Sequence, residues 1–282
     1  MKVLVTGYNG QLGYDVVRRL ENLNIECLGT ERKKFDLTSK EDTRDFIMNY
    51  KPDVVVHCAA YTAVDKAEDE KEVCYDINVN GTRYIAEVCK EIDAKMVYIS
   101  TDYVFDGDGV DPFNENNIPN PVNYYGETKY EGELEVQKIL EKYFIVRISW
   151  VFGINGNNFV KTMLKLGKER DEISVVSDQV GSPTYTYDLA NLLVEMIMTD
   201  KYGIYHATNE GDCSWYEFAC EIFKQSGIDI IVRPINTEEY PTRAKRPKNS
   251  RLFKEKLERE GFDKLPEWKK SLNDYLSKFK LY

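Results

Sequence analysis

Two side chains suited to proton transfer, Tyr125 and Lys129, stand four residues apart, so on a helix they share one face. Tyrosine has a pKa of about 10 and is a poor acid–base group at neutral pH unless a neighbouring cation stabilises its phenolate. Lys129 can supply that cation. Because the chain holds 20 tyrosines, the spacing also fits a plain surface pair. The pair follows Ser100-Thr101-Asp102 at the end of a strand-like run, so a helix can present Tyr125 to whatever Thr101 contacts. We therefore predict a catalytic group of Tyr125, Lys129 and Thr101, with the Thr101 hydroxyl bound to a substrate oxygen.

A glycine-rich turn stands at the beginning of the chain, in the run Gly7-Tyr8-Asn9-Gly10-Gln11-Leu12-Gly13. It comes directly after the first strand-like segment and opens the first helical one. Gly7 permits a tight turn, Gly10 lets the backbone approach a pyrophosphate, and Gly13 allows close helix packing, while the helix N-terminus favours an anion. The alternative is a turn that merely needs a positive φ. We predict a dinucleotide site that includes Gln11 and Leu12.

The second predicted strand is followed by Thr30-Glu31-Arg32-Lys33, where a residue that binds the cofactor ribose is expected. Glu31 can accept a hydrogen bond from a ribose 2′-hydroxyl, whereas Arg32 or Lys33 can pair with a 2′-phosphate. The cofactor is therefore NADPH or NADH, with Thr30 and Arg32 among the binding residues.

Five short apolar runs alternate with helix-like stretches over residues 1–150. Runs that are apolar on both faces fit a parallel sheet covered on both sides, and the alternation predicts a doubly wound α/β domain of the Rossmann type. We expect a smaller, mainly helical substrate-binding region over residues 151–282, with part of 171–200 returning to the sheet domain and a ligand between the two parts. The predicted strands are Lys2–Thr6, Ile25–Gly29, Asp53–Cys58, Lys95–Ser100 and Phe144–Ser149, and the predicted helices are Gln11–Leu23, Lys40–Tyr50, Val73–Ile92, Glu127–Lys142, Asn158–Arg170, Tyr187–Thr199, Ser214–Ser226 and Glu267–Phe279.

Composition excludes several classes of protein. With 282 residues, 42% hydrophobic and 30% charged, the chain is neither disordered nor collagen-like. A net charge of −10 argues against a nucleic-acid partner. Its apolar runs stay far below the roughly 18 residues of a membrane span, and the first residues enter a strand pattern without a leader sequence. We expect a cytoplasmic monomer or homodimer that acts on a small molecule.

Motifs spread over nearly the whole chain resemble the dTDP-4-dehydrorhamnose reductase family of the extended short-chain dehydrogenase/reductase superfamily. The resemblance implies hydride transfer between a nicotinamide cofactor and C4 of a deoxyhexulose linked to dTDP, the last step of dTDP-L-rhamnose synthesis. The motifs that carry it are the GxxGxxG turn, AYTAVDKAE at 60–68, Ser100-Thr101-Asp102-Tyr103-Val104-Phe105-Asp106-Gly107, Tyr125 to Lys129, Ser149-Trp150-Val151, Asn157-Asn158-Phe159, Gly181-Ser182-Pro183-Thr184 and Arg246-Pro247-Lys248-Asn249-Ser250.

The same resemblance implies substrate contacts. Tyr125 would protonate the C4 oxygen, Thr101 and Asp102 would contact the sugar, and Trp150 would pack on it, although Trp150 also fits the core. The segment 243–259 holds eight Lys and Arg residues, and Arg246 is the first candidate for pairing with the substrate diphosphate. A solvated helix flank is the alternative for the later residues of that segment.

Further cofactor contacts are expected at two loops. Asp36-Leu37 resembles the pair that holds adenine in this superfamily, and a solvated loop acid is the alternative. The third strand runs into Cys58-Ala59-Ala60-Tyr61-Thr62, whose small residues let the backbone of Ala60, Tyr61 and Thr62 lie against the cofactor, unless they serve only strand-to-helix packing.

The chain departs from the family pattern at two places. Some members dimerise around a divalent cation held by acidic residues; Asp15 keeps one acid, but Tyr187 occupies another position, so we predict no metal site. His57 stands where the family often has Asn, and as a single neutral histidine at a strand end we interpret it as a packing residue.

Three other functions share the scaffold. The 4,6-dehydratases carry Asp-Glu after the strand-four Thr, whereas Tyr103 follows Asp102 here. A 4-epimerase would consume no reduced cofactor. A non-catalytic binding module, similar to the regulatory subunit of methionine adenosyltransferase, would bind cofactor without turnover and need a partner subunit.

Overall fold

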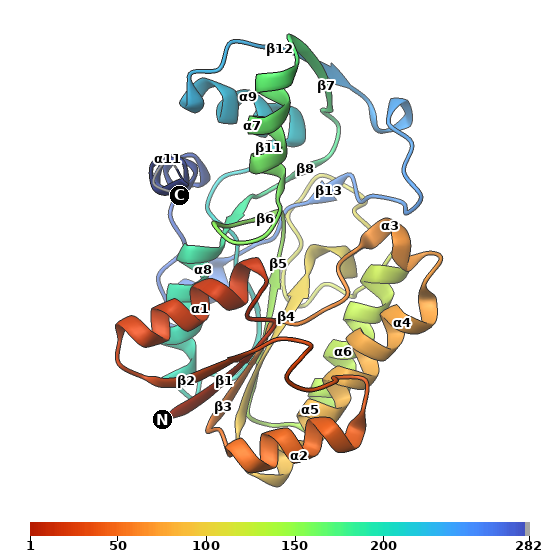
Figure 1. The fold of residues 1–282 in the computed structure, drawn as a ribbon. Helices are drawn as coiled ribbons and strands as arrows, with labels where there is room; N and C mark the ends of the chain where they lie inside the picture. The colour runs from red at the N-terminus through yellow and green to blue at the C-terminus, as the bar shows by residue number, and fades with distance from the viewer. Residues whose placement is uncertain (280–282) are drawn as a thin grey trace.

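Six parallel strands form the central sheet of the computed structural model, which describes residues 1–279 (Figure 1). Their order is β10-β5-β4-β3-β1-β2, and each neighbouring pair runs parallel. The chain moves from β1 to β2 on one side and then to β3 on the other, so a crevice is expected beside β1, at the carboxyl ends of the strands. The six strands are β1 (Lys2–Thr6), β2 (Glu26–Thr30), β3 (Val54–His57), β4 (Lys95–Thr101), β5 (Tyr143–Ile148) and β10 (Gly203–His206).

Helices cover both faces of this sheet, as strands apolar on both sides require (Figure 1). Two of them pack on one face and bury Val5 and Val16, and three follow one another across the other face and bury Leu4 and Ile85. The first face carries α1 (Gln11–Asn22) and α8 (Thr186–Ile197), and the second carries α2 (Lys40–Tyr50), α5 (Gly81–Glu91) and α6 (Tyr124–Ile139).

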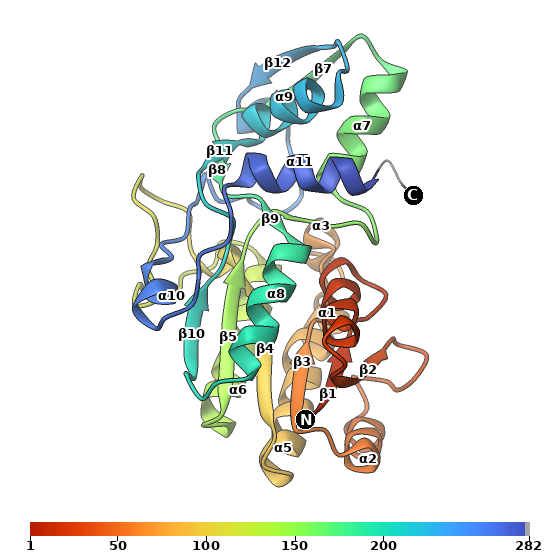
Figure 2. The same ribbon diagram turned by 90° about the vertical axis from the view of Figure 1, so that its left-hand side faces the viewer.

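A second layer lies above the carboxyl ends of the strands (Figure 2). Its core is aromatic, with Phe152, Phe218 and Tyr275 in contact. It contains α7 (Phe159–Glu169), α9 (Trp215–Ser226), α11 (Trp268–Phe279), the parallel pair β7 (Glu172–Val176) and β12 (Ile231–Ile235), and the short strands β6 (Val151–Phe152), β8 (Val180–Gly181), β9 (Thr184–Tyr185), β11 (Cys213–Ser214) and β13 (Asn249–Ser250). The remaining short helices are α3 (Val64–Ala67), α4 (Lys71–Tyr75), the π-helix η1 (Asp76–Asn80), the 3-10 turns η2 (Asp102–Val104) and η3 (Thr237–Glu239), and α10 (Glu255–Arg259).

The predicted doubly wound parallel sheet is confirmed, and the five predicted strands lie within about one residue of the observed ones. Strands β10, β7 and β12 were not predicted. β10 has four residues and begins at Gly203 with a φ of +133°, so it shows almost no periodic pattern. β12 is largely exposed and contains Pro234, which argues against a strand. The predicted helix Val73–Ile92 is divided into α4, η1 and α5.

The division of the chain at residue 150 stays a prediction. Beyond that residue, α8 packs on α1, and β10 joins the edge of the main sheet beside β5. Within residues 1–279, none of the helices combines the length and the apolar character that crossing a membrane requires.

Candidate active site

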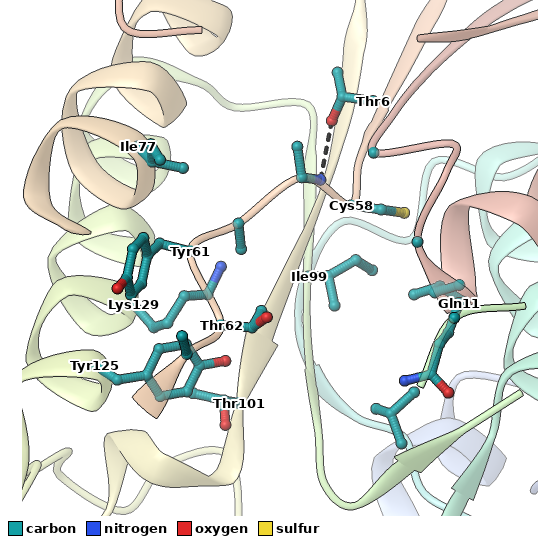
Figure 3. A pocket seen from close by; sticks show the side chains of 18 of the residues that line it. Thr6, Gln11, Cys58, Tyr61, Thr62, Ile77, Ile99, Thr101, Tyr125 and Lys129 are labelled. Atoms are coloured by element: carbon teal, nitrogen blue, oxygen red, sulfur yellow. Dashed lines mark hydrogen bonds between the residues drawn. The ribbon is translucent and has the colours of Figure 1, made fainter. Parts of the chain in front are cut away.

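A cavity of about 830 Å³ opens at the carboxyl ends of the parallel strands, below the second layer (Figure 3). It is where the strand order predicts a ligand crevice. Most of the predicted site residues line it, from segments far apart in the chain. They are Gly7, Gly10, Gln11, Leu12, Thr30, Arg32, Asp36, Leu37, Ala60, Tyr61, Thr62, Thr101, Asp102, Tyr125, Lys129 and Trp150.

The glycine turn forms one wall of the cavity. Gly7 has a φ of +70°, and a Cβ there would lie 2.8 Å from the backbone nitrogen of Ala59, so any side chain would collide with the β3 loop. Gly10 caps α1 without a side-chain hydrogen bond, which leaves the first amides of this helix available to an anion. Gly13, which we counted among the cofactor-binding residues of this turn, does not line the cavity. A Cβ there would collide with the Gly7 carbonyl oxygen, so Gly13 serves the close helix packing that we also predicted for it.

The loop after β3 is held against the turn by hydrogen bonds. The Ala59 amide donates to Thr6 Oγ1 at 3.1 Å (Figure 3), and the Tyr61 amide donates to Asn78 Oδ1 at 2.8 Å. Asn78 lies in the π-helix η1, a local widening that often occurs at functional sites. The backbone of this loop therefore faces the cavity in a fixed conformation. No pattern in the sequence marks Asn78, because a π-turn has no distinct apolar period.

His57 is a buried packing residue, as predicted. Its Nδ1 lies 2.8 Å from Thr6 Oγ1, its Nε2 lies 3.2 Å from Thr82 Oγ1, and the side chain is 1% exposed. Burial, with a smaller effect of the Lys129 charge, lowers the pKa of His57 to about 3. The ring is therefore neutral at physiological pH and fixes Thr6.

Thr101, Tyr125 and Lys129 converge on one side of the cavity (Figure 3). Thr101 ends β4, and Tyr125 and Lys129 lie on the first two turns of α6, whose N-cap Asn123 accepts a hydrogen bond from Gly126. The ring of Tyr125 meets Tyr103 edge to face at 5.8 Å. The three side chains that we predicted to act together are thus adjacent in space.

The pKa of Tyr125 lies above its usual range, whereas the sequence led us to expect that Lys129 would lower it. Burial raises that pKa, the Asp102 carboxylate raises it further, and a hydrogen bond with Thr101 only partly opposes the rise. Burial also lowers the pKa of Lys129 itself to about 7, against the attraction of Glu133. Nζ of Lys129 lies 4.0 Å above the ring of Tyr98. Tyr125 is therefore a neutral phenol near pH 7, a form that can give up a proton but not accept one.

Asp102 presents a carboxyl group beside Thr101. It is 4% exposed, and burial raises its pKa to about 6, although hydrogen bonds with Ser250 and Thr101 favour the charged form. The group therefore changes its charge close to neutral pH.

Trp150 lines the cavity and has a φ of +49°, a conformation that is uncommon for a bulky residue. Its ring stacks on Trp215 with centroids 3.7 Å apart, and Phe159 packs on Trp215 at 4.6 Å. Trp215, at the start of α9, also lines the cavity. We did not predict it, because its contact with Trp150 spans 65 positions of the chain and no local pattern marks it.

Arg246 does not line the cavity. Its guanidinium donates to Asp65 at 2.6 Å and lies 6.0 Å from the ring of Tyr103, which in turn contacts Tyr125. Neighbouring basic residues are paired as well, Arg243 with Asp69 and Lys254 with Glu210. Much of the charge of the segment 243–259 is thus neutralised by the protein, and direct pairing of Arg246 with a ligand would require its side chain to turn away from Asp65.

The rim of the cavity after β2 combines charges of both signs. Glu31 and Arg32 line it, and the Asp36 carboxylate accepts two hydrogen bonds from Thr38, which together with Arg32 lower its pKa. Leu37 lies beside them. Both kinds of ribose recognition therefore remain available at this rim.

Asp15, the acidic residue that we considered as a metal ligand, is hydrogen-bonded to another side chain of the protein. Asp15 on α1 accepts a hydrogen bond from Thr186 on α8, and burial raises its pKa. Tyr187 follows Thr186, and its ring lies 3.6 Å from Nζ of Lys278. Among the described residues, no cluster of three or more His, Cys, Asp or Glu side chains has the arrangement of a metal site.

Known proteins match this chain over its whole length. The family model of the RmlD substrate binding domain matches residues 1–281. The spore coat polysaccharide biosynthesis protein SpsK of Bacillus subtilis is 41% identical over 98% of this chain and 96% of its own length. A crystal structure of a dTDP-4-dehydrorhamnose reductase from Clostridium acetobutylicum is 46% identical, with a TM-score of 0.97 over 99% of this chain and 100% of that one. The corresponding reductase of Bacillus anthracis, in complex with NADP, is 44% identical, with a TM-score of 0.96 over 99% of this chain and 100% of that one. The chain therefore belongs to the RmlD substrate binding domain family.

Proposed function

We propose that this protein reduces the C4 ketone of dTDP-4-dehydro-L-rhamnose to dTDP-L-rhamnose with NADPH or NADH. The observation that carries the proposal is the convergence of Thr101 and the neutral phenol of Tyr125 on a cavity that begins at a glycine turn. The names of the similar proteins support the same substrate and reaction.

The cavity fits a dinucleotide. At Gly7 the backbone lies so close to Ala59 that no side chain would fit, and the uncapped start of α1 would receive the pyrophosphate. Arg32, Asp36 and Leu37 would hold the adenosine half, and the backbone of 60–62 together with Lys129 would hold the nicotinamide half. A bound reduced nicotinamide supplies the hydride that ketone reduction requires.

Proton transfer to the substrate is carried out by side chains of this protein. The Tyr125 phenol donates its proton to the C4 oxygen as negative charge develops there, and its raised pKa keeps that proton available near pH 7. Thr101 would bind the same oxygen after its hydroxyl hydrogen turns from Asp102 Oδ1 towards the ligand. The Lys129 ammonium then stabilises the phenolate that remains, because the two groups lie one helical turn apart in a water-poor pocket.

Trp150 and Trp215 would cover the sugar. Their stacked rings line the cavity and can exclude water from the reacting carbonyl group. Asp102 would bind a sugar hydroxyl, and Arg246 would contact the substrate diphosphate after release from Asp65.

We further propose a cytoplasmic enzyme that acts as a monomer or homodimer. A sugar nucleotide and a nicotinamide cofactor are metabolites of the cytoplasm, which supports that location. Light scattering of the purified protein would decide the oligomeric state.

The decisive experiment follows NADPH, then NADH, by absorbance with purified protein and dTDP-4-dehydro-L-rhamnose, and identifies the product. Oxidation of one cofactor per molecule of dTDP-L-rhamnose is the expected result. Cofactor binding without oxidation would refute the proposal and favour a binding module. Interconversion of the C4 epimers of a dTDP-hexose without net loss of reduced cofactor would favour an epimerase.

A further inference from the structure

Helix α6 carries a third polar side chain on the face that holds Tyr125 and Lys129. Glu133 follows them at intervals of four residues, a spacing that keeps all three on one face, and it is 0% exposed. The helix lies very close to β4 here, because a Cβ on Gly132 would be 2.3 Å from the Tyr98 hydroxyl. The face that reaches the cavity with Tyr125 thus continues into the protein interior with a buried carboxylate.

Two strands bind this carboxylate directly. Ser100 on β4 donates to Glu133 Oε1 at 2.5 Å. Arg147 on β5 donates twice, from Nε to Oε1 at 2.9 Å and from Nη2 to Oε2 at 2.7 Å, and its side chain is 2% exposed. Both oxygens therefore have charge-assisted hydrogen bonds, the strongest kind in proteins.

A neutral histidine completes the network. Nη1 of Arg147 lies 3.4 Å from Nε2 of His206, and Nδ1 of His206 lies 3.1 Å from the carbonyl oxygen of Phe113. A guanidinium only donates and a carbonyl only accepts, so Nδ1 of the ring carries the hydrogen and Nε2 accepts. Burial and the Arg147 charge keep the pKa of His206 well below its usual range. The charges of this network are thus those of Glu133 and Arg147, which balance.

We propose that Glu133 is a positioning residue for the Tyr125–Lys129 pair. Its bond to Ser100 fixes the next residue, Thr101, relative to the helix that carries Tyr125, although the two belong to different elements. Its negative charge, one helical turn from Lys129, opposes the effect of burial and favours the cationic form of that side chain. The inference rests on the proposed reductase function, which assigns the roles of Tyr125, Lys129 and Thr101.

The other titratable groups around Lys129 do not supply this charge. They come from β3 and its loop, from α4, from β4 and from α6 itself. Burial holds His57 neutral and raises the pKa of Cys58 to about 12, and it raises the pKa values of Cys74, Tyr98 and Tyr125 as well. Near pH 7 all five side chains are uncharged. The negative charge that acts on Lys129 is therefore that of the Glu133 carboxylate.

The charge effect is tested by titrating Lys129 in protein made with isotope-labelled lysine, with Lys129→Arg used to assign its NMR signal. Glu133→Gln keeps an acceptor for Ser100 but removes the charge, so the pKa of Lys129 should fall by about one unit or more. The matched control is Glu127→Gln, an exposed position on the same helix, where no change is expected. An unchanged titration in Glu133→Gln would overturn this half of the proposal.

The single variant leaves Arg147 buried without its partner, which destabilises a fold. The double variant Glu133→Gln with Arg147→Met removes both charges together. It should fold and show a pKa of Lys129 below that of wild type, with a smaller fall than in Glu133→Gln because the Arg147 charge is removed as well. It should also lose about tenfold or more in kcat, with the alkaline limb of the pH profile moved to lower pH. A folded double variant with wild-type kcat and wild-type titration would overturn the proposal.

The hydrogen bond between Ser100 and Glu133 is tested separately by Ser100→Ala, which removes this bond and leaves the Glu133 charge in place. We expect a lower kcat with an unchanged titration of Lys129. A wild-type kcat would show that the Ser100–Glu133 bond does not position Thr101. Because the NMR titration needs neither substrate nor cofactor, it reports on Glu133 even if wild-type protein fails to reduce the sugar nucleotide, and that failure would refute the proposed function instead.

Discussion

Thr101 donates its hydroxyl hydrogen bond to Oδ1 of its chain neighbour Asp102 at 2.9 Å, and both side chains are buried in the wall of the cavity. β4 ends at Thr101 and a 3-10 turn begins at Asp102, which brings two consecutive side chains to the same side of the backbone. The amide of Tyr103 donates to Thr101 Oγ1 at 3.2 Å. Asp102 and this turn therefore hold the Thr101 hydroxyl in one orientation, facing Tyr125.

Replacing Thr101 tests that arrangement. Thr101→Val should reduce kcat/KM for the sugar nucleotide by about tenfold, the loss expected for one hydrogen bond to the reacting oxygen. Thr101→Ser keeps the hydroxyl and should recover most of the activity in the same steady-state assay. If Thr101→Val is as active as wild type, Thr101 does not bind the substrate oxygen.

Loss of the proton donor should be more severe. Tyr125→Phe removes the phenolic hydroxyl but keeps the ring, so we expect a fall in kcat of about 10²-fold or more, with cofactor affinity retained. Tyr124→Phe, one residue earlier on α6 and outside the cavity lining, is the matched control. Comparable turnover in the two variants would remove Tyr125 from the mechanism.

The preference for NADPH or NADH should depend on the residues that follow β2 at the edge of the cavity. If Arg32 pairs with a 2′-phosphate, Arg32→Ala should raise the KM for NADPH by about tenfold and leave that for NADH nearly unchanged. Lys34→Ala, an exposed position outside the cavity lining, controls for the general loss of positive charge. Equal effects of Arg32→Ala on both cofactors would contradict an ion pair with the phosphate.

Acid should destabilise the fold through His57. Its folded pKa of about 3 lies below the usual 6.5, so its contribution to stability is complete above that value and is lost as the pH falls from 6.5 towards 3. His57→Asn removes this titration while keeping a polar group for Thr6 and Thr82. Urea unfolding at about pH 7.5 and about pH 4.5 should show that the variant loses roughly 2 kcal/mol less than wild type between the two.

His206 is present in both proteins, so its own titration cancels in that comparison. An equal loss of stability in wild type and variant would show that His57 is not held neutral in the folded protein.

Features that are local in the chain could be predicted from the residues alone. The glycine turn, the five buried strands and the spacing of Tyr125 and Lys129 depend on neighbours within about one or two turns, where backbone sterics and side-chain period are decisive. The order of these segments also predicted the crevice at the carboxyl ends of the strands, because parallel strands joined by helices all end at one edge.

Contacts between side chains far apart in the chain could be found only in the folded protein. Trp215 stacks on Trp150, Arg246 pairs with Asp65, and Glu133 joins two strands, and none of these contacts follows from a periodic pattern. The raised pKa of Tyr125 likewise came from burial, which depends on how the layers close around it. The sequence shows which residue types are present. Their charge and their partners depend on tertiary contacts, because these contacts bring together segments far apart in the chain and remove the side chains from water.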